Sequence, residues 1–399
     1  MKILISGSIG WFLFLLILPF TLNRTTLPPQ AKAEWANVGK IVAVGDVHGA
    51  FDEFVAILQE LKLVDPQLNW VGGKTHFVQT GDSIDRGAQD RKVLDLLMEL
   101  EKQAEKAGGR VHPLLGNHEV MNVIGDLRYV AREVYAAFAT EKSEELREKT
   151  YARYVKYRTA RAERNLPKQS FSPAPNFKDE WMANHPPGYL EHRKAFSEAG
   201  IYGRWLSNRN AVLKLNDTVF LHGGISEAVS KLSIREINER IQRELKTFHE
   251  ARSVLVRSGI LEDYLDFAET MQQVALEVKY LQAKGGADDL AVLKALGELQ
   301  ASGNWFITNP NAPLWYRGLA QEPEDVFQPI FDRIKTNLGV ARFVIGHTPS
   351  LTGITSRFSG AVFLIDTGML RKYYNGRCAA LVIENGKFSP VYPTKGACS

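Results

Sequence analysis

KIVAVGDVHG, residues 40–49, joins a short apolar run to a polar turn, and the same arrangement recurs along the chain. The run Lys40 to Val44 predicts a buried β-strand. The turn after it holds an aspartate and a histidine between glycines, which let the backbone turn sharply and keep bulk away from a bound ion or phosphate. One such segment would be weak evidence, but four others follow apolar runs in the same way: residues 81–87 (GDSIDRG), 116–119 (GNHE), 222–224 (HGG) and 346–348 (GHT).

Strand-like runs alternate with helical periodicity, which predicts a layered α/β sheet. Helical spacing is clear in residues 51–61 and from about 90 to 106. In such sheets, functional groups cluster at the carboxyl ends of the strands, so the five polar segments are expected to meet at one edge. The predicted strands are residues 40–44, 75–79, 110–115, 218–221, 342–345, 361–365 and 379–383.

Two long stretches, about 127–207 and 233–303, interrupt this alternation. The first begins with a charged helical segment, which is typical of a solvated helix face, and continues into a predicted loop over residues 166–188, rich in Pro, Asn and Ser. The second has apolar residues at helical spacing. We interpret both as helical insertions that form a cap over the α/β core.

The N-terminus has the pattern of a targeting segment. After Lys2, the 18 residues from Ile3 to Phe20 carry no charge, and Ala31-Lys32-Ala33 suits a signal peptidase, which would leave Glu34 first. The alternatives are an uncleaved anchor, because this length just spans a bilayer, and a buried helix. Cleaved or anchored, the body of residues 34–399 is expected outside the cytoplasm, for example in a periplasm.

Composition narrows the class of protein. Hydrophobic residues make up 45% of the 399 and charged residues 24%, as in a globular protein with a large core. Three of the 49 basic residues and none of the 45 acidic ones fall in residues 1–33, so the other 366 carry a formal charge of +1. This near-neutral balance argues against a nucleic-acid partner. Cys378 and Cys398 could pair in an oxidising compartment or remain free thiols, and the sequence does not decide.

The polar turns combine carboxylate and amide oxygens with imidazole nitrogens. Such mixed ligands suit Mn, Fe or Zn better than an all-oxygen calcium cage. Neither cysteine has the spacing of a zinc ligand, so a structural zinc site is not expected.

GDVHG, GDSIDRG, GNHE, HGG and GHT, in this order, resemble the motifs of metallophosphoesterases and specifically of the phosphoprotein phosphatase family. The longer stretches GNHEVMN, GRWLSNRNAVLKLNDTVFLHGG, PLWYRG, GHTP and IDTGM are similar to the Shewanella-like protein phosphatase branch. The resemblance covers residues 40–383 and is weak in both helical stretches. It implies the calcineurin-like fold, a layered β-sandwich core flanked by helices. IDTGM stands where eukaryotic Ser/Thr phosphatases have their SAPNYC loop, so their toxin sensitivity and regulatory subunits do not carry over.

The resemblance also implies two divalent or trivalent metal ions, bridged by one aspartate. Two ions about 3.5–4 Å apart lower the pKa of a bridging water and neutralise phosphoryl oxygens together. A carboxylate suits the bridge because its two oxygens and its negative charge serve both ions. Asp46, His48 and Asp82 would hold the first ion, and Asp82, Asn117, His222 and His347 the second.

Matching positions imply catalytic roles as well. His118 would be the general acid that protonates the departing alkoxide, with Asp85 orienting it and keeping it protonated. The guanidinium group of Arg86 can hold two phosphate oxygens through two parallel hydrogen bonds.

Three further arginines and one glutamate are less certain. Arg317 is expected to be a second phosphate clamp, the alternative being a surface or interface arginine, and Arg204 and Arg209 compete for that role. Glu119 could support the site or only begin a helix, so it is left out of the catalytic set.

These features predict a binuclear metallophosphoesterase that hydrolyses phosphomonoesters through a metal-bridging hydroxide. The expected substrates are phosphoproteins (phospho-Ser/Thr, with phospho-Tyr open) or small phosphomonoesters, a choice that rests on resemblance alone. The alternatives are a hydrolase of phosphoanhydrides such as dinucleoside polyphosphates, a nucleic-acid phosphodiesterase, and an inactive metal-binding module. A membrane contact is expected only if the N-terminal segment is retained, and the sequence leaves the oligomeric state open.

Overall fold

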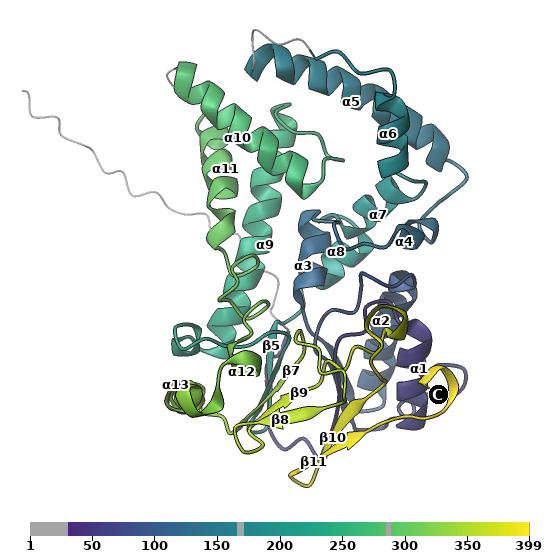
Figure 1. Ribbon diagram of the computed structural model, residues 1–399, viewed down its shortest axis with the longest axis vertical. Helices are drawn as coiled ribbons and strands as arrows, with labels where there is room; N and C mark the ends of the chain where they lie inside the picture. Colours follow the sequence, from purple (N-terminus) through teal and green to yellow (C-terminus); the bar gives the residue numbers. More distant parts are fainter. Residues whose placement is uncertain (1–30, 166–170, 285–288, 399) are drawn as a thin grey trace, which may run out of the picture.

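The computed structural model describes residues 31–165, 171–284 and 289–398, and two β-sheets form its base (Figure 1). The predicted targeting segment lies outside the described residues, apart from residues 31–33. The six-stranded sheet runs, in spatial order, β1 (Glu34–Trp35), β5 (Val212–Leu215), β6 (Thr218–Leu221), β7 (Arg342–Ile345), β9 (Val362–Leu364) and β8 (Thr355–Arg357). The five-stranded sheet runs β11 (Lys387–Val391), β10 (Ala380–Glu384), β2 (Lys40–Val44), β3 (His76–Gln79) and β4 (Arg110–Pro113).

The two sheets pack face to face over a shared apolar layer. Alternate residues of each strand point to opposite faces, so Ile41 and Ala43 of β2 enter this layer while Val42 and Val44 face the other way. Phe220 of β6 enters from the six-stranded sheet and is fully buried. The predicted layered β-sandwich is therefore confirmed.

Helices cover the outer faces of the sandwich. α1 (Phe51–Glu60) and α2 (Asp90–Lys106) pack Phe54 and Leu97 onto the five-stranded sheet. α13 (Glu324–Leu338) covers the other sheet, where the rings of Phe331 and Phe343 lie 5.9 Å apart. The shorter helices of this part are α3 (Asn117–Ile124), α12 (Gly318–Gln321), α14 (Arg371–Tyr374), η1 (Val229–Lys231), η2 (Ser302–Asn304) and η3 (Gly396–Cys398).

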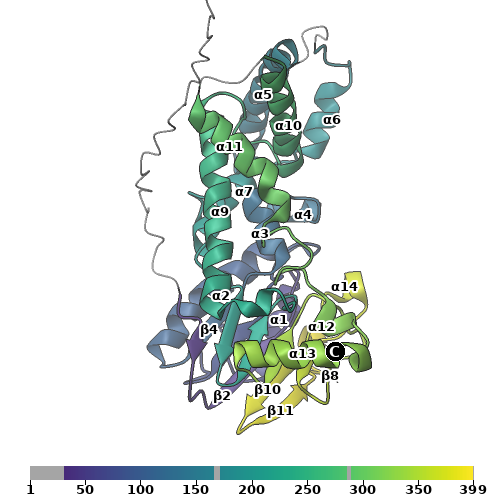
Figure 2. The ribbon, with the colours of Figure 1, turned by 90° about the vertical axis from the view of Figure 1, so that its left-hand side faces the viewer.

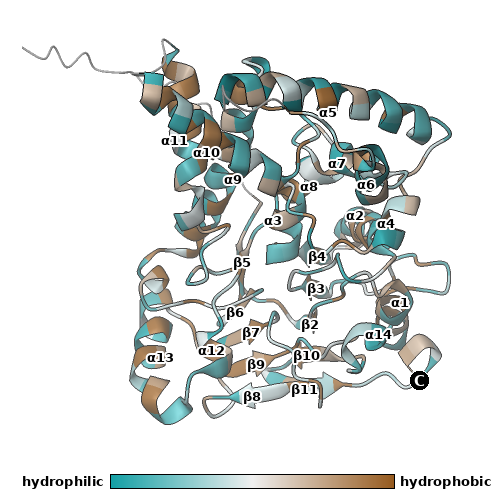
Figure 3. Ribbon diagram, turned by 45° about the horizontal axis from the view of Figure 1, so that its top comes forward, coloured by the Kyte–Doolittle hydropathy of each residue, from teal (hydrophilic) through white to brown (hydrophobic). Residues whose placement is uncertain are grey.

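The two interrupting stretches are helical, and their helices extend away from the sandwich (Figures 1 and 2). The long helix α5 is mostly hydrophilic (Figure 3), and its buried residues, such as Tyr154 and Tyr157, follow one face. The first stretch holds α4 (Arg132–Ala136), α5 (Ser143–Asn165), α6 (Phe177–Asn184), α7 (Tyr189–Phe196) and α8 (Ile201–Leu206). The second holds α9 (Ile234–Arg257), α10 (Phe267–Lys284) and α11 (Leu290–Ala301).

The prediction of a loop over residues 166–188 was wrong for its second half, because α6 lies there. Tertiary packing overrides the Pro- and Asn-rich composition: Trp181 of α6 is only 5% exposed, and its ring lies 5.6 Å from that of Tyr151 on α5. Residues 166–170 lie outside the described part of the chain.

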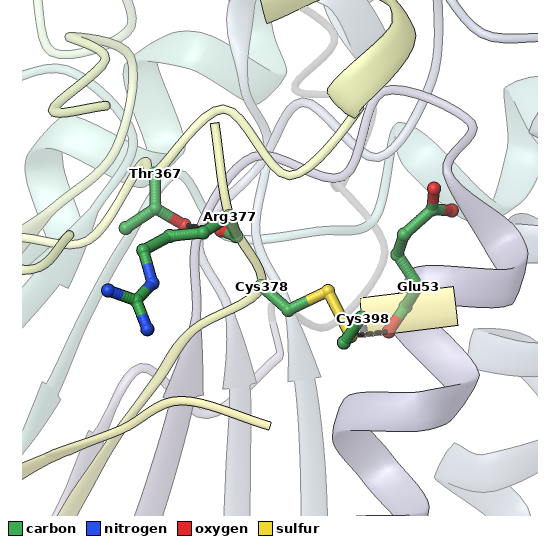
Figure 4. The surroundings of a disulfide bond; sticks show 5 residues. All are labelled: Glu53, Thr367, Arg377, Cys378 and Cys398. Carbon is green, nitrogen blue, oxygen red and sulfur yellow. Dashed lines mark hydrogen bonds between the residues drawn. A yellow bond between two sulfur atoms is a disulfide. The ribbon is translucent and has the colours of Figure 1, made fainter. Parts of the chain in front are cut away.

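The question of the two cysteines is answered by a disulfide between Cys378 and Cys398 (Figure 4). Cys378 precedes β10, and Cys398 lies in η3 against α1, where its sulfur is 3.6 Å from the carbonyl oxygen of Glu53. The bond therefore fastens the C-terminal tail to the sandwich.

A search for membrane spans covered the described ranges only. In residues 31–165, 171–284 and 289–398, no helix is both long and apolar enough to cross a membrane.

Candidate metal centre

All five polar turns follow the carboxyl ends of strands, as predicted. β2, β3 and β4 are parallel and end just before Asp46, Asp82 and Asn117, while β6 and β7 are parallel and end before His222 and His347. Since the two sheets face each other, their strand ends bring six side chains into one buried group, called here the central cluster: Asp46, His48, Asp82, Asn117, His222 and His347.

Asp82 lies at the middle of the central cluster. Its Oδ2 is 3.2 Å from His222 Nε2 and 3.8 Å from His48 Nε2. His222 Nε2 is also 2.9 Å from both Asn117 Oδ1 and His347 Nδ1. Burial opposes the charged form of Asp82, but the neighbouring imidazoles outweigh it and hold its pKa well below the usual value. The side chain assigned to the bridge therefore touches both predicted ligand sets.

Asp46 meets a carboxylate that sequence reasoning missed. Its side chain shares a hydrogen bond with Asp366, which follows β9, and accepts the backbone N–H of His347 at 3.1 Å. Burial raises the pKa of Asp46, helped by the charges of Asp366 and Asp82, and burial also raises the pKa of Asp366 to about 6. Three aspartates thus converge where like charges repel one another.

The donor set fits metal ions on three counts. Two ring nitrogens, on His222 and His347, face each other at 2.9 Å. Only one of the two can donate a proton to the other, so the second acts as an acceptor with a lone pair. The other nitrogen of His222 has no hydrogen-bond partner although it is buried. Burial lowers the pKa of His48 to about 3 and that of His347 to about 2, which keeps both imidazoles neutral, as metal ligands must be.

On distance alone, two triads could each hold an ion. One is Asp82 with His222 and His347, and the other is Asp82 with His48 and His118. The second differs from the predicted set, which has Asp46 in place of His118.

His118, however, is already engaged through its other nitrogen. Its Nδ1 is 2.6 Å from Asp85 Oδ2, and Asn122 Nδ2 donates to Asp85 Oδ1 at 2.9 Å. Burial lowers the pKa of His118, but the charge of Asp82 and the hydrogen bond to Asp85 outweigh it, so the pKa is raised. Its Nε2 remains directed at the cluster, 3.7 Å from Asp82 Oδ2. A protonated imidazole held in this way is suited to donate a proton.

Glu119 ties two of the ligand turns together. Its carboxylate accepts the backbone N–H groups of Asp82 and Gly116 at 2.8 Å and that of Ser83 at 2.7 Å. Gly116 has to be glycine, since a Cβ there would overlap the Asp82 carboxylate. Glu119 therefore supports the site rather than only beginning α3, although the prediction left it out.

Arg86 lies beside the central cluster and contacts one of its members. It is partly buried, and its Nη1 donates to His48 Nε2 at 2.8 Å, while the Nδ1 of His48 faces the carbonyl oxygen of Ile84. A metal bound through His48 Nε2 would displace this contact. Three tyrosine rings, called here the tyrosine rim, lie 5.4 to 5.6 Å from the guanidinium carbon: Tyr129, Tyr373 and Tyr374.

Of the three competing arginines, only Arg317 reaches the cluster. Its Nη1 donates to the carbonyl oxygen of His347 at 2.6 Å and to Thr348 Oγ1 at 3.0 Å. Arg209 instead pairs with Glu101 on α2, and Arg204 is exposed on α8.

The backbone is strained at this centre. Five of the site residues adopt positive φ angles, a conformation that costs on the order of 1–3 kcal/mol for a non-glycine residue and that clusters at functional sites. The residues and their φ angles are His48 (50°), Asp82 (56°), Asp85 (71°), Arg86 (68°) and His347 (63°).

Known proteins resemble this chain over most of its length. A family model described as calcineurin-like phosphoesterase matches residues 39–351. An uncharacterised protein of Schizosaccharomyces pombe is 29% identical over 89% of this chain and 80% of its own length. Shewanella-like protein phosphatase 2 of Arabidopsis thaliana is 30% identical over 53% of each chain.

A solved structure shares this fold. The crystal structure of a cold-active protein tyrosine phosphatase from a psychrophilic Shewanella species aligns with a TM-score of 0.55 over 92% of this chain and 83% of that one, at 24% identity. With the family model matching well over half of the residues, the chain belongs to the calcineurin-like phosphoesterase family.

Proposed function

We propose that this metal-dependent phosphoesterase hydrolyses phosphomonoesters, and that its substrates are phosphoproteins. The observation that carries the proposal is the buried pair of His118 and Asp85 beside Asp82, because hydrolysis of an alkyl or aryl monoester needs a proton for the departing oxygen. A module that only binds metal would not need this pair.

The six residues of the central cluster would hold the two ions. When bound, two ions would lower the pKa of water and neutralise phosphoryl oxygens. We propose Asp82 as the ligand common to both ions, Asp46 and His48 as ligands of the first, and Asn117, His222 and His347 as ligands of the second. Mn, Fe and Zn all accept these donors.

The remaining roles fall to residues that do not bind metal. His118 donates the proton from Nε2 to the leaving oxygen, and Asp85 keeps the imidazole oriented and charged. Arg86 and Arg317 flank the cluster, where two guanidinium groups can hold phosphate oxygens and stabilise the charge that grows in the transition state.

The tyrosine rim indicates which phosphorylated residues the site could accept. Tyr373 is 59% exposed and Tyr129 is 41% exposed, so aromatic faces are open to solvent beside Arg86. Such faces would stack on an aromatic leaving group. We therefore propose that phosphotyrosine is accepted along with phosphoserine and phosphothreonine. The Shewanella structure is named a protein tyrosine phosphatase, and the Arabidopsis relative is named a protein phosphatase.

A substrate panel tests this proposal. The metal-loaded protein is offered three phosphopeptides of one sequence, carrying phosphoserine, phosphothreonine or phosphotyrosine, together with a dinucleoside tetraphosphate. Turnover of the peptides with none of the tetraphosphate supports the proposal. The reverse pattern would replace it with phosphoanhydride hydrolysis.

We further propose that the protein acts outside the cytoplasm. The apolar N-terminal segment supports export, and the disulfide between Cys378 and Cys398 suits an oxidising compartment. Fractionation of producing cells would place the mature chain, and N-terminal sequencing would distinguish cleavage before Glu34 from a retained anchor.

A further inference from the structure

A concentration of positively charged side chains lies in the helical part of the molecule, outside the central cluster. A cavity of about 530 Å³ opens there between α3, α5, α7 and α9. Five cationic side chains and two carboxylates line it: Arg153, Arg193, Lys194, Arg252 and Arg257, with Glu198 and Asp263.

Arg193 and Arg252 are the innermost cations. Arg193 is only 7% exposed, and burial lowers the pKa of both guanidinium groups, that of Arg252 to about 10 with the charge of Arg193 contributing. In the part of the chain that the structure describes, neither has a carboxylate within ion-pair distance. A terminal nitrogen of each donates to the backbone carbonyl oxygen of Leu265, at 3.4 Å from Arg193 and at 2.9 Å from Arg252.

Several buried polar atoms of this cavity lack a partner. The Nε–H groups of Arg193 and Arg252 have no acceptor, and the same holds for His249 Nε2 and the hydroxyl of Tyr264. A buried donor without an acceptor costs about 1–3 kcal/mol, more when it is charged. The neighbouring guanidinium groups of Arg193 and Arg252, each with an unused N–H donor, could therefore bind an anion.

Apolar side chains line the cavity as well. They include Val123 and Ile124 of α3, Leu190 of α7, and Phe248 of α9. The volume falls within the range of about 300–1,000 Å³ that is usual for small-molecule sites. A ligand that fills it would need an anionic head and an apolar body.

We propose that this cavity binds a small organic oxyanion, a phosphate or phosphonate monoester in size and charge, with its head between Arg193 and Arg252 and its body against Phe248. The site is distinct from the metal centre: Ile124 lies six positions after His118 on α3, about 9 Å along the helix axis. Arg193 packs against Gly125, which ends α3, so the ligand would lie at the far end of the helix that carries His118.

The test uses phenylphosphonate, which has an apolar ring and cannot be hydrolysed, and inorganic phosphate as the head alone. Calorimetric titration of the metal-loaded protein is repeated after chelation, which removes binding to the metal centre. The proposal expects one phenylphosphonate site that survives chelation and binds inorganic phosphate more weakly. The absence of phenylphosphonate binding after chelation would overturn the proposal. Equal affinity for the two probes would overturn the proposed contact between the ligand's apolar body and Phe248.

Variants locate that site. Arg193→Met and Arg252→Met each remove charge-assisted hydrogen bonds and should weaken the chelation-resistant site roughly tenfold or more. Arg240→Met is the matched control, because Arg240 also lies on α9 but pairs with Glu244, and it should leave the affinity unchanged. Unchanged affinity in both folded test variants would overturn the assignment. The titration of the unaltered protein decides the matter even if a variant does not fold.

Discussion

Replacing Asp85 by asparagine isolates the proton-donating role of His118 from metal binding. Asp85 Oδ2 holds His118 Nδ1 at 2.6 Å, and its Oδ1 accepts from Asn122 Nδ2 at 2.9 Å. Asparagine has one acceptor in place of two. If its oxygen faces His118, its amide meets the amide of Asn122, and if it is reversed, the imidazole loses its acceptor. In either case the negative charge that favours protonated His118 is gone.

The magnitude follows from the bond that is lost. A hydrogen bond to a charged group contributes about 1.5–3 kcal/mol, which corresponds to a rate loss of about 10- to 150-fold wherever the proton is needed in the transition state. Phenyl phosphate needs that proton, because phenolate is a poor leaving group. Dinitrophenyl phosphate leaves without it and should lose much less. Asp85→Asn is therefore expected to steepen the dependence of kcat on the leaving group while both metals stay bound.

The assay compares kcat for the two esters, with metal content measured on the same samples. Asp90→Asn is the matched control, since Asp90 is the buried first residue of α2 and accepts the backbone N–H of Asp85 without touching His118. Burial and the charge of Asp85 raise the pKa of Asp90 well above its usual value, so the neutral amide is a fair replacement. An equal loss of kcat for both esters in Asp85→Asn would refute the assigned role.

Three more predictions concern phosphate binding, pH and the disulfide. Arg86→Ala should weaken inhibition by inorganic phosphate about tenfold or more, since a charged hydrogen bond is lost; an unchanged inhibition constant would remove Arg86 from the site. Burial lowers the pKa of His192 to about 3, against about 6.5 in the unfolded chain, so its neutral form stabilises the fold fully above pH 6.5 and progressively less below it. On going from pH 7 to 5.5 in urea titrations, His192→Leu should therefore lose about 1.3 kcal/mol less unfolding free energy than the unaltered protein; equal losses would show that His192 does not contribute. The Cys378→Ser, Cys398→Ser double variant should lose about 3 kcal/mol of stability, the chain-entropy value for a sequence separation of 20 residues; the prediction fails if reduction of the unaltered protein leaves its Tm unchanged.

What the sequence predicts well is local. Each motif turn can be recognised because an apolar run, a glycine and a polar side chain follow one another within a few residues, and such a run forms a strand wherever it is buried on both faces. The strands before Asp46, His222 and His347 were predicted at their observed bounds for this reason.

What the sequence predicts poorly depends on contacts between distant segments. Asp366 follows a strand in the same way as the other aspartates, so that signal was present, but only the folded chain shows its carboxylate against Asp46. Glu119 gains its role from backbone N–H groups more than 30 residues away in sequence. α6 forms because Trp181 finds aromatic partners on α5, which its own composition does not reveal.

The most direct test of a two-metal phosphomonoesterase is to strip residues 34–399 with a chelator, add back Mn, Fe or Zn, and follow metal content and phosphopeptide hydrolysis together. The account predicts that activity disappears with the metal and returns as two ions bind per chain. It also predicts that Asp82→Asn recovers neither ion at full affinity. Activity that persists in metal-free protein, or two tightly bound ions without any phosphomonoester turnover, would contradict it.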